Sequence, residues 1–202
     1  MELLWVRHAE PERIAPGTGV RADPALTARG TEQAQRLADW LAFEPIDAIL
    51  CSPLQRAVDT ATPIAASCGV AIEVVDDLIE YDNNSDHYIP MEEMRLNKDE
   101  RWQAMVDGRW DEFGADLPDV FRARVDAVTT ALIERFPGRR IVAVCHGGVI
   151  NVALGSVLGI GQPLWFEPGY TSVSRMIASR TGVRSVASMN ELAHLEAKRE
   201  RP

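Results

Sequence analysis

Several features that mark other classes of protein are scarce in this sequence. It has three cysteines among 202 residues, which is too few for a disulfide framework, and their spacing is not that of metal ligands. We expect Cys51 and Cys145, which lie in or beside apolar runs, to be buried. No apolar run is long enough to span a bilayer, and the first residues lack the layout of a signal peptide. We therefore expect a cytoplasmic protein with no membrane partner.

Basic residues are also in the minority. The chain has 21 Lys and Arg residues against 30 Asp and Glu residues, which gives a net charge of -9. An anionic surface repels nucleic acid and anionic lipid, so we expect no nucleic-acid partner. If the ligand is itself an anion, a few arginines in a pocket must overcome this background locally. Clustered arginines are therefore the feature to look for.

Strand and helix signals alternate along the chain. Helices are predicted after the N-cap residue Thr27, from Ser52-Pro53 with a kink or break near Pro63, at 119–136 and after Gly148. Apolar runs predict strands at 2–7, 48–51, 70–75, 141–145, 172–179 and 183–189. The alternation predicts an α/β fold, a three-layer sandwich with a mostly parallel central sheet flanked by helices.

The length suits a single domain covering residues 1–202. Residues 82–118 differ in character, because they are polar with tryptophans among the charges. We interpret this stretch as a helical or irregular insertion, and either a lid over a site or a solvated surface excursion fits its composition.

Three of the predicted strands end in residues that can handle phosphate. Arg7 and His8 end the first strand, Arg56 lies in the helix after the second, and His146 and Gly147 follow the strand at 141–145. A single histidine after a strand is more often structural, and a single arginine on a helix is usually solvated. Ligands of parallel sheets bind at the carboxyl ends of the strands, so the combination predicts a phosphate site.

The chemistry of phosphoryl transfer explains this grouping. Guanidinium groups match the equatorial oxygens of a phosphoryl group, and a neutral imidazole can attack phosphorus and carry the group covalently. A second imidazole, if protonated, can donate to an equatorial oxygen. The helix that begins at Gly147 adds backbone N–H groups and a favourable dipole.

The leaving oxygen needs a proton, which a carboxylic acid at the edge of the pocket can supply. Glu80, just after the predicted strand at 70–75, is the best candidate, and Asp82 is a weaker rival. The alternative is that Glu80 is a surface carboxylate with no part in catalysis.

These segments resemble the histidine phosphatase superfamily, which includes the cofactor-dependent phosphoglycerate mutases. Residues 7–10, Arg-His-Ala-Glu, are similar to its Arg-His-Gly-Glu signature, and residues 52–57 and 145–148 resemble its second arginine and second histidine segments. The resemblance implies a phosphoglycerate mutase-like fold with His8 as the phosphorylated nucleophile. It further implies that Arg7, Arg56 and His146 bind the phosphoryl group and that Glu80 is the proton donor. Neither a metal nor another cofactor is expected.

Departures from the family pattern favour a phosphatase over a mutase. Ala9 replaces the usual glycine, Pro11 stands where Thr or Ser is common, and Ile14 stands where many members have Asn. We therefore predict a phosphatase that hydrolyses a phosphate monoester through a phosphohistidine on His8. Phosphoglycerate mutase-type transfer is the first alternative. A non-catalytic protein that binds a phosphorylated ligand is the second, although such a relative would usually lack at least one of these residues.

Further residues are weaker candidates for contacts with a phosphorylated small-molecule substrate. Arg13 and Arg21 flank a glycine-containing loop and could bind a second anionic group, and His87 with Tyr88 could touch the substrate from the insertion. A surface role is the safer interpretation of each. We expect His194 to be structural, and a homodimer is plausible without any feature that requires it.

Overall fold

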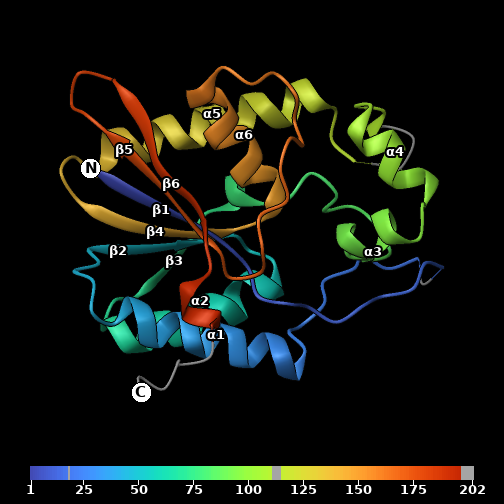
Figure 1. The fold of residues 1–202 in the computed structure, drawn as a ribbon, viewed down its shortest axis with the longest axis horizontal. Helices are drawn as coiled ribbons and strands as arrows, with labels where there is room; N and C mark the ends of the chain where they lie inside the picture. Colours follow the sequence, from blue (N-terminus) through green and yellow to red (C-terminus); the bar gives the residue numbers. More distant parts are fainter. Residues whose placement is uncertain (18, 111–114, 197–202) are drawn as a thin grey trace.

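The computed structural model describes residues 1–17, 19–110 and 115–196 (Figure 1). Its centre is a six-stranded sheet in the order β3-β2-β4-β1-β5-β6. The strands are β1 (Glu2–Arg7), β2 (Ala48–Cys51), β3 (Ile72–Val74), β4 (Arg140–Cys145), β5 (Val173–Ala178) and β6 (Arg184–Glu191). β3 is shorter than predicted because it is an edge strand that pairs with β2 alone.

The sheet is mostly parallel, as the alternation of elements predicted. β1, β2, β3 and β4 all run in one direction. β5 pairs antiparallel with both β1 and β6, so it alone is reversed. The carboxyl ends of β2, β4 and β1 are consequently neighbours at one edge of the sheet, and the residues that follow them are brought together.

Helices cover both faces of the sheet and complete the three layers (Figure 1). Leu3 and Trp5 of β1 face one hydrophobic cluster, and the intervening Leu4 and Val6 face another, as expected for a strand buried on both sides. The first cluster is shared with α5 (Pro118–Arg135) and α6 (Gly147–Leu158). The second is shared with α1 (Ala28–Leu41) and α2 (Gln55–Cys68).

Local signals in the sequence explain most helix boundaries. Thr27 caps α1 by accepting a hydrogen bond from the Gly30 N–H at 2.9 Å, as predicted. Of the kink or break predicted near Pro63, the break is absent, because α2 continues through this residue to Cys68. Pro63 lies on a partly exposed side of the helix, where water can satisfy the carbonyl that loses its N–H partner. Cys51 and Cys145 are both buried, as expected.

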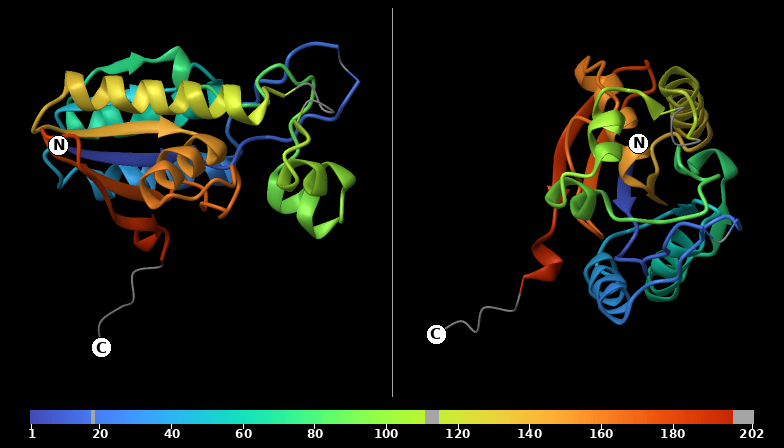
Figure 2. Two further views of the ribbon diagram at one scale, coloured as in Figure 1. Left: turned by 90° about the horizontal axis from the view of Figure 1, so that it is seen from above. Right: turned by 90° about the vertical axis from the view of Figure 1, so that its right-hand side faces the viewer.

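The insertion lies at the carboxyl end of the sheet. It contains two short helices, α3 (Met91–Leu96) and α4 (Glu100–Val106), which extend beyond the sandwich in Figure 1 and in the left view of Figure 2. Ile14 and Tyr88 form an isolated antiparallel bridge that joins the glycine-containing loop to this insertion. Residues 111–114 of the insertion fall outside the described part. In the described ranges, no helix has both the length and the apolar character needed to cross a bilayer.

Candidate active site

The register of the central strands brings the two predicted histidine segments side by side. Arg7 at the end of β1 is paired with Cys145 at the end of β4, and the His8 N–H donates to the Cys145 carbonyl at 2.9 Å. His8 and His146 therefore leave adjacent strands at the same level. Their ring centroids are 5.1 Å apart.

The hydrogen bonds of His8 define which ring nitrogen is available for attack. Nδ1 lies 2.7 Å from the Ala9 carbonyl oxygen, which can only accept, so Nδ1 carries the hydrogen. Nε2 is then unprotonated and accepts from Arg56 Nε at 3.3 Å. The lone pair of Nε2 is thus held beside a guanidinium group that can also hold a phosphoryl oxygen.

Electrostatics keep His8 neutral. Burial, with further contributions from the charges of Arg56 and Arg7, lowers its pKa well below 6.5. A neutral imidazole is the form that can act as a nucleophile towards phosphorus.

Two buried guanidinium groups flank His8. Arg56, in the first turn of α2, is 2% exposed, and its guanidinium lies 4.8 Å from the centroid of the Tyr88 ring. Within the described part of the chain, no carboxylate lies within ion-pair distance of Arg56. Arg7 donates to the Pro168 carbonyl at 2.6 Å and lies 3.5 Å from the Glu92 carboxylate. A buried cation without a counter-ion is costly, so this place favours an anionic ligand.

The ring of His146 packs beside that of His8, and His146 is fully buried. Its Nε2 is 2.7 Å from the Ser52 hydroxyl, while Nδ1 has no hydrogen-bond partner among the described residues. Burial and the nearby Arg56 lower its pKa well below 6.5. Before an anion binds, His146 is therefore neutral rather than protonated, and it can offer a phosphoryl oxygen an N–H but no charge.

Glu80 is a buried carboxyl group with the properties of a proton donor. Its Oε2 accepts from the Gly148 N–H at 2.9 Å, and its Oε1 accepts from the Tyr81 N–H at 3.2 Å. Burial, with a further contribution from the charge of Asp82, raises its pKa to about 7. A side chain at position 148 would displace it, since a Cβ there would lie 2.4 Å from Glu80 Oε1. Burial also raises the pKa of Asp82, the weaker candidate.

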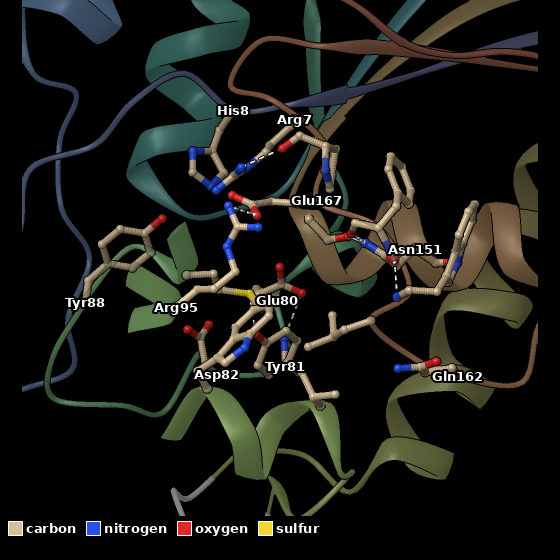
Figure 3. A pocket seen from close by; sticks show the side chains of 18 of the residues that line it. Arg7, His8, Glu80, Tyr81, Asp82, Tyr88, Arg95, Asn151, Gln162 and Glu167 are labelled. Atoms are coloured by element: carbon tan, nitrogen blue, oxygen red, sulfur yellow. Dashed lines mark hydrogen bonds and ion pairs between the residues drawn. The ribbon is translucent and has the colours of Figure 1, made fainter. Parts of the chain in front are cut away.

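A cavity of about 340 Å³ joins these groups (Figure 3). Arg7, His8, Arg56, Glu80 and Gly147, five of the residues predicted for the site, line its wall, and Asp82 and Tyr88 do so as well. His146, the other histidine predicted for the site, is fully buried and is not among the lining residues.

Of the weaker candidates for substrate contacts, Tyr88 lines the cavity, whereas Arg13, Arg21 and His87 do not. Arg13 is exposed and forms an ion pair with Glu93, and Arg21 is exposed. His87 contacts the side chains of neighbouring residues, including Arg101 at 3.2 Å. His194 contacts the Thr171 hydroxyl at 3.0 Å and stacks on Trp40, away from the cavity.

Sequence reasoning missed the segment between α6 and β5. Both the nitrogen and the oxygen of the Asn151 side-chain amide, in α6, form hydrogen bonds with the backbone of this segment. Its nitrogen donates to the Gly147 and Phe166 carbonyls, each at 2.9 Å, and its oxygen accepts from the N–H groups of Trp165 at 2.9 Å and Phe166 at 3.0 Å. This clamp holds the aromatic pair against the cavity. Two adjacent aromatic residues in a loop after an apolar helix were the available signal.

The arrangement can bind a phosphoryl group, attack it and protonate a leaving oxygen. Arg7 and Arg56 supply the positive charge, His8 Nε2 the lone pair and Glu80 the proton. Across the described residues, no three His, Cys, Asp or Glu side chains come together as a metal site would require.

Comparison with known proteins agrees with this chemistry. The model of the histidine phosphatase superfamily (branch 1) matches residues 3–191. The chain is 29% identical to phosphoserine phosphatase 1 of Hydrogenobacter thermophilus, covering 96% of this chain and 94% of that one. It is 35% identical to phosphoglycerate mutase-like protein 4 of Arabidopsis thaliana, covering 74% and 68%. Among solved structures, Bacillus stearothermophilus YhfR superposes with a TM-score of 0.80 at 21% identity, covering 96% and 99%.

Proposed function

The chain belongs to the histidine phosphatase superfamily, and we propose that it is a phosphatase that hydrolyses phosphate monoesters through a phosphoryl group carried on His8, without a metal ion. The observation that carries the proposal is the buried pair of His8 and Arg56. The unprotonated Nε2 lies 3.3 Å from a guanidinium that has no carboxylate partner in the described part of the chain. An incoming phosphate monoester would supply that missing anion and place its phosphorus beside the lone pair.

The first step transfers the phosphoryl group to the enzyme. The Nε2 lone pair of His8 forms the bond to phosphorus while the bond from phosphorus to the ester oxygen breaks. Protonated Glu80 donates its proton to the leaving oxygen, which departs as an alcohol. Arg7 and Arg56 stabilise the charge on the phosphoryl oxygens, and a neutral His146 adds an N–H donor.

The second step returns the enzyme to its starting state. Glu80, now a carboxylate, accepts a proton from a water molecule as that water attacks the phosphorus. The bond from phosphorus to Nε2 breaks, the lone pair returns to His8, and inorganic phosphate leaves. Glu80 is protonated again, so neither step needs another reactant.

The charges in the cavity favour hydrolysis over phosphoglycerate mutase-type transfer. Arg95 is the lining guanidinium besides Arg7 and Arg56, and it is already paired with Glu167 at 3.3 Å. The Asp82 carboxyl lines the same cavity. We call the part of the cavity lined by Arg7, His8 and Arg56 the phosphate end. Among the described residues that line the rest of the cavity, no unpaired cation is available to bind a carboxylate of the substrate.

The test is phosphate release from p-nitrophenyl phosphate by the native chain, with a chelator present. Chelator-resistant release of inorganic phosphate is the expected result. In parallel, phosphoglycerate and a bisphosphorylated primer are supplied, and the positions of the phosphoryl group are followed. Interconversion of phosphoglycerates faster than phosphate release would identify a mutase instead. Tight binding of phosphate with no turnover of either substrate would identify a binding protein.

A further inference from the structure

The cavity extends well beyond the groups that act on phosphate. Figure 3 shows Glu80 between His8 on one side and Gln162 on the other. The groups that act on phosphate therefore lie at one side of the cavity, and the space on the Gln162 side remains for the rest of a substrate. The remaining wall is built from α3, α4 and the loop after α6. We call its side chains the apolar wall: Met91, Trp102, Val106, Leu164, Trp165 and Phe166.

The apolar wall leaves hydrophobic surface open to the cavity. Five of its six residues are only partly buried, Leu164 being the exception. Large apolar side chains that line a concave pocket and remain accessible mark a place where an apolar ligand group is buried. The volume of about 340 Å³ falls within the range of small-molecule pockets.

The apolar wall is held in a fixed arrangement. The Trp165 indole N–H donates to the Asn151 carbonyl at 2.9 Å, and the Trp165 and Phe166 ring centroids are 4.6 Å apart. Across the cavity, the Tyr81 hydroxyl donates to the Met91 sulfur at 3.3 Å. A preformed surface loses little freedom when a ligand packs on it, so its contacts add to affinity.

The charges of this region oppose a second anion on the ligand. Glu167 forms an ion pair with Arg95, and Asp82 adds a further acidic group. We infer that the apolar wall binds an uncharged leaving group, and that the preferred substrates are phosphate monoesters of neutral alcohols carrying a large apolar group. This inference rests on the proposed function, because it assumes that the substrates are phosphate monoesters. It concerns the apolar wall and not the groups that act on phosphate.

Two esters of similar primary alcohols test the inference without changing the leaving-group chemistry. These are propyl phosphate and 3-phenylpropyl phosphate, with 3-phosphoglycerate as the anionic comparison. We expect kcat/KM for 3-phenylpropyl phosphate to exceed that for propyl phosphate by roughly 10- to 100-fold, because each methylene buried in an apolar pocket is already worth about tenfold or more. We expect 3-phosphoglycerate to be the poorest of the three.

Variants assign this preference to the wall. Trp102→Ala and Val106→Ala should each reduce the ratio of the two kcat/KM values, because the larger ester loses more contact with the wall than the smaller one. Phe43→Ala is the matched control, because Phe43 is 91% exposed and lies outside the cavity. Thermal unfolding of each variant separates a lost contact from a lost fold.

Binding of non-hydrolysable phosphonates separates this inference from the proposed function. Calorimetric titration should show 3-phenylpropylphosphonate binding at least about tenfold more tightly than propylphosphonate. Equal affinities, or a preference for 3-phosphoglycerate, would overturn the inference even if the phosphatase activity is established. Tighter binding of the phenyl compound together with no hydrolysis of any ester would support the apolar wall and overturn the proposed function.

Discussion

Substitution of His8 by alanine is expected to lower the turnover of p-nitrophenyl phosphate by on the order of 10⁴-fold or more. The variant keeps Arg7 and Arg56 and can still bind phosphate, but no group in its place offers a lone pair to phosphorus. The Michaelis constant or inhibition constant for phosphate should change far less than kcat. Initial rates and phosphate inhibition, measured on the same preparation, give both quantities.

His194→Ala is the matched control for this variant. This variant likewise removes an imidazole, but the His194 ring is only partly buried and contacts Thr171 and Trp40 instead of lining the cavity. We expect it to retain nearly native kcat. If His8→Ala and His194→Ala lose activity equally, or if His8→Ala retains native turnover, the assignment of the nucleophile is wrong.

Substitution of Glu80 by glutamine is expected to lower kcat for an alkyl phosphate by about 10²- to 10⁴-fold, the usual contribution of a general acid or base. The effect on the phosphorylation step should be much smaller with p-nitrophenyl phosphate, because nitrophenolate leaves readily without a proton. If Glu80 had only a structural role, the substitution would slow the phosphorylation step equally with both substrates. Single-turnover measurements of alcohol release from the two esters provide the comparison.

The same variant should change the dependence of activity on pH. Glu80 donates only when protonated, and its pKa is raised to about 7, so kcat/KM for an alkyl phosphate should fall as the pH rises through that value. His8 attacks only when neutral, and its pKa lies well below 6.5, so its protonation should reduce activity only in more acidic solution. In Glu80→Gln the decline at alkaline pH should disappear.

Glu73→Gln serves as the control for both effects. Glu73 is a half-exposed carboxylate of β3 that pairs with Arg135, and it lies outside the cavity. An alkaline decline that persists unchanged in Glu80→Gln, or a loss that is the same for both esters, would show that another group supplies the proton. Asp82 is the residue to examine next.

The sequence contained enough information to predict the layers of the fold and the phosphate end of the cavity. Both follow from local patterns, because apolar runs define β1, β2 and β4, and the residue after a strand must lie at its carboxyl end. Arg7, His8 and Arg56 could therefore be placed together before any contact was known. Glu80 could be singled out as well, because it follows the predicted strand at 70–75, and the resemblance to the family implied the same role for it.

The apolar wall could not be predicted in this way. Its residues come from two short insertion helices and from an irregular loop, and their positions depend on long-range contacts such as the clamp made by Asn151. The protonation of His146 was likewise beyond the sequence. Its pKa depends on how deeply the ring is buried and on how close Arg56 lies, and both are properties of the folded chain.

The measurement that tests the central claim most directly is the identification of the phosphorylated residue. The Glu80→Gln chain is suited to it, because p-nitrophenyl phosphate should phosphorylate His8 without an acid while the missing base slows attack by water. The reaction is stopped in alkali, in which phosphohistidine survives, and the peptides are sequenced by mass spectrometry. We predict a phosphoryl group on His8 that is lost in mild acid. A phosphoryl group on another residue, or steady turnover with His8 unmodified, would contradict the account.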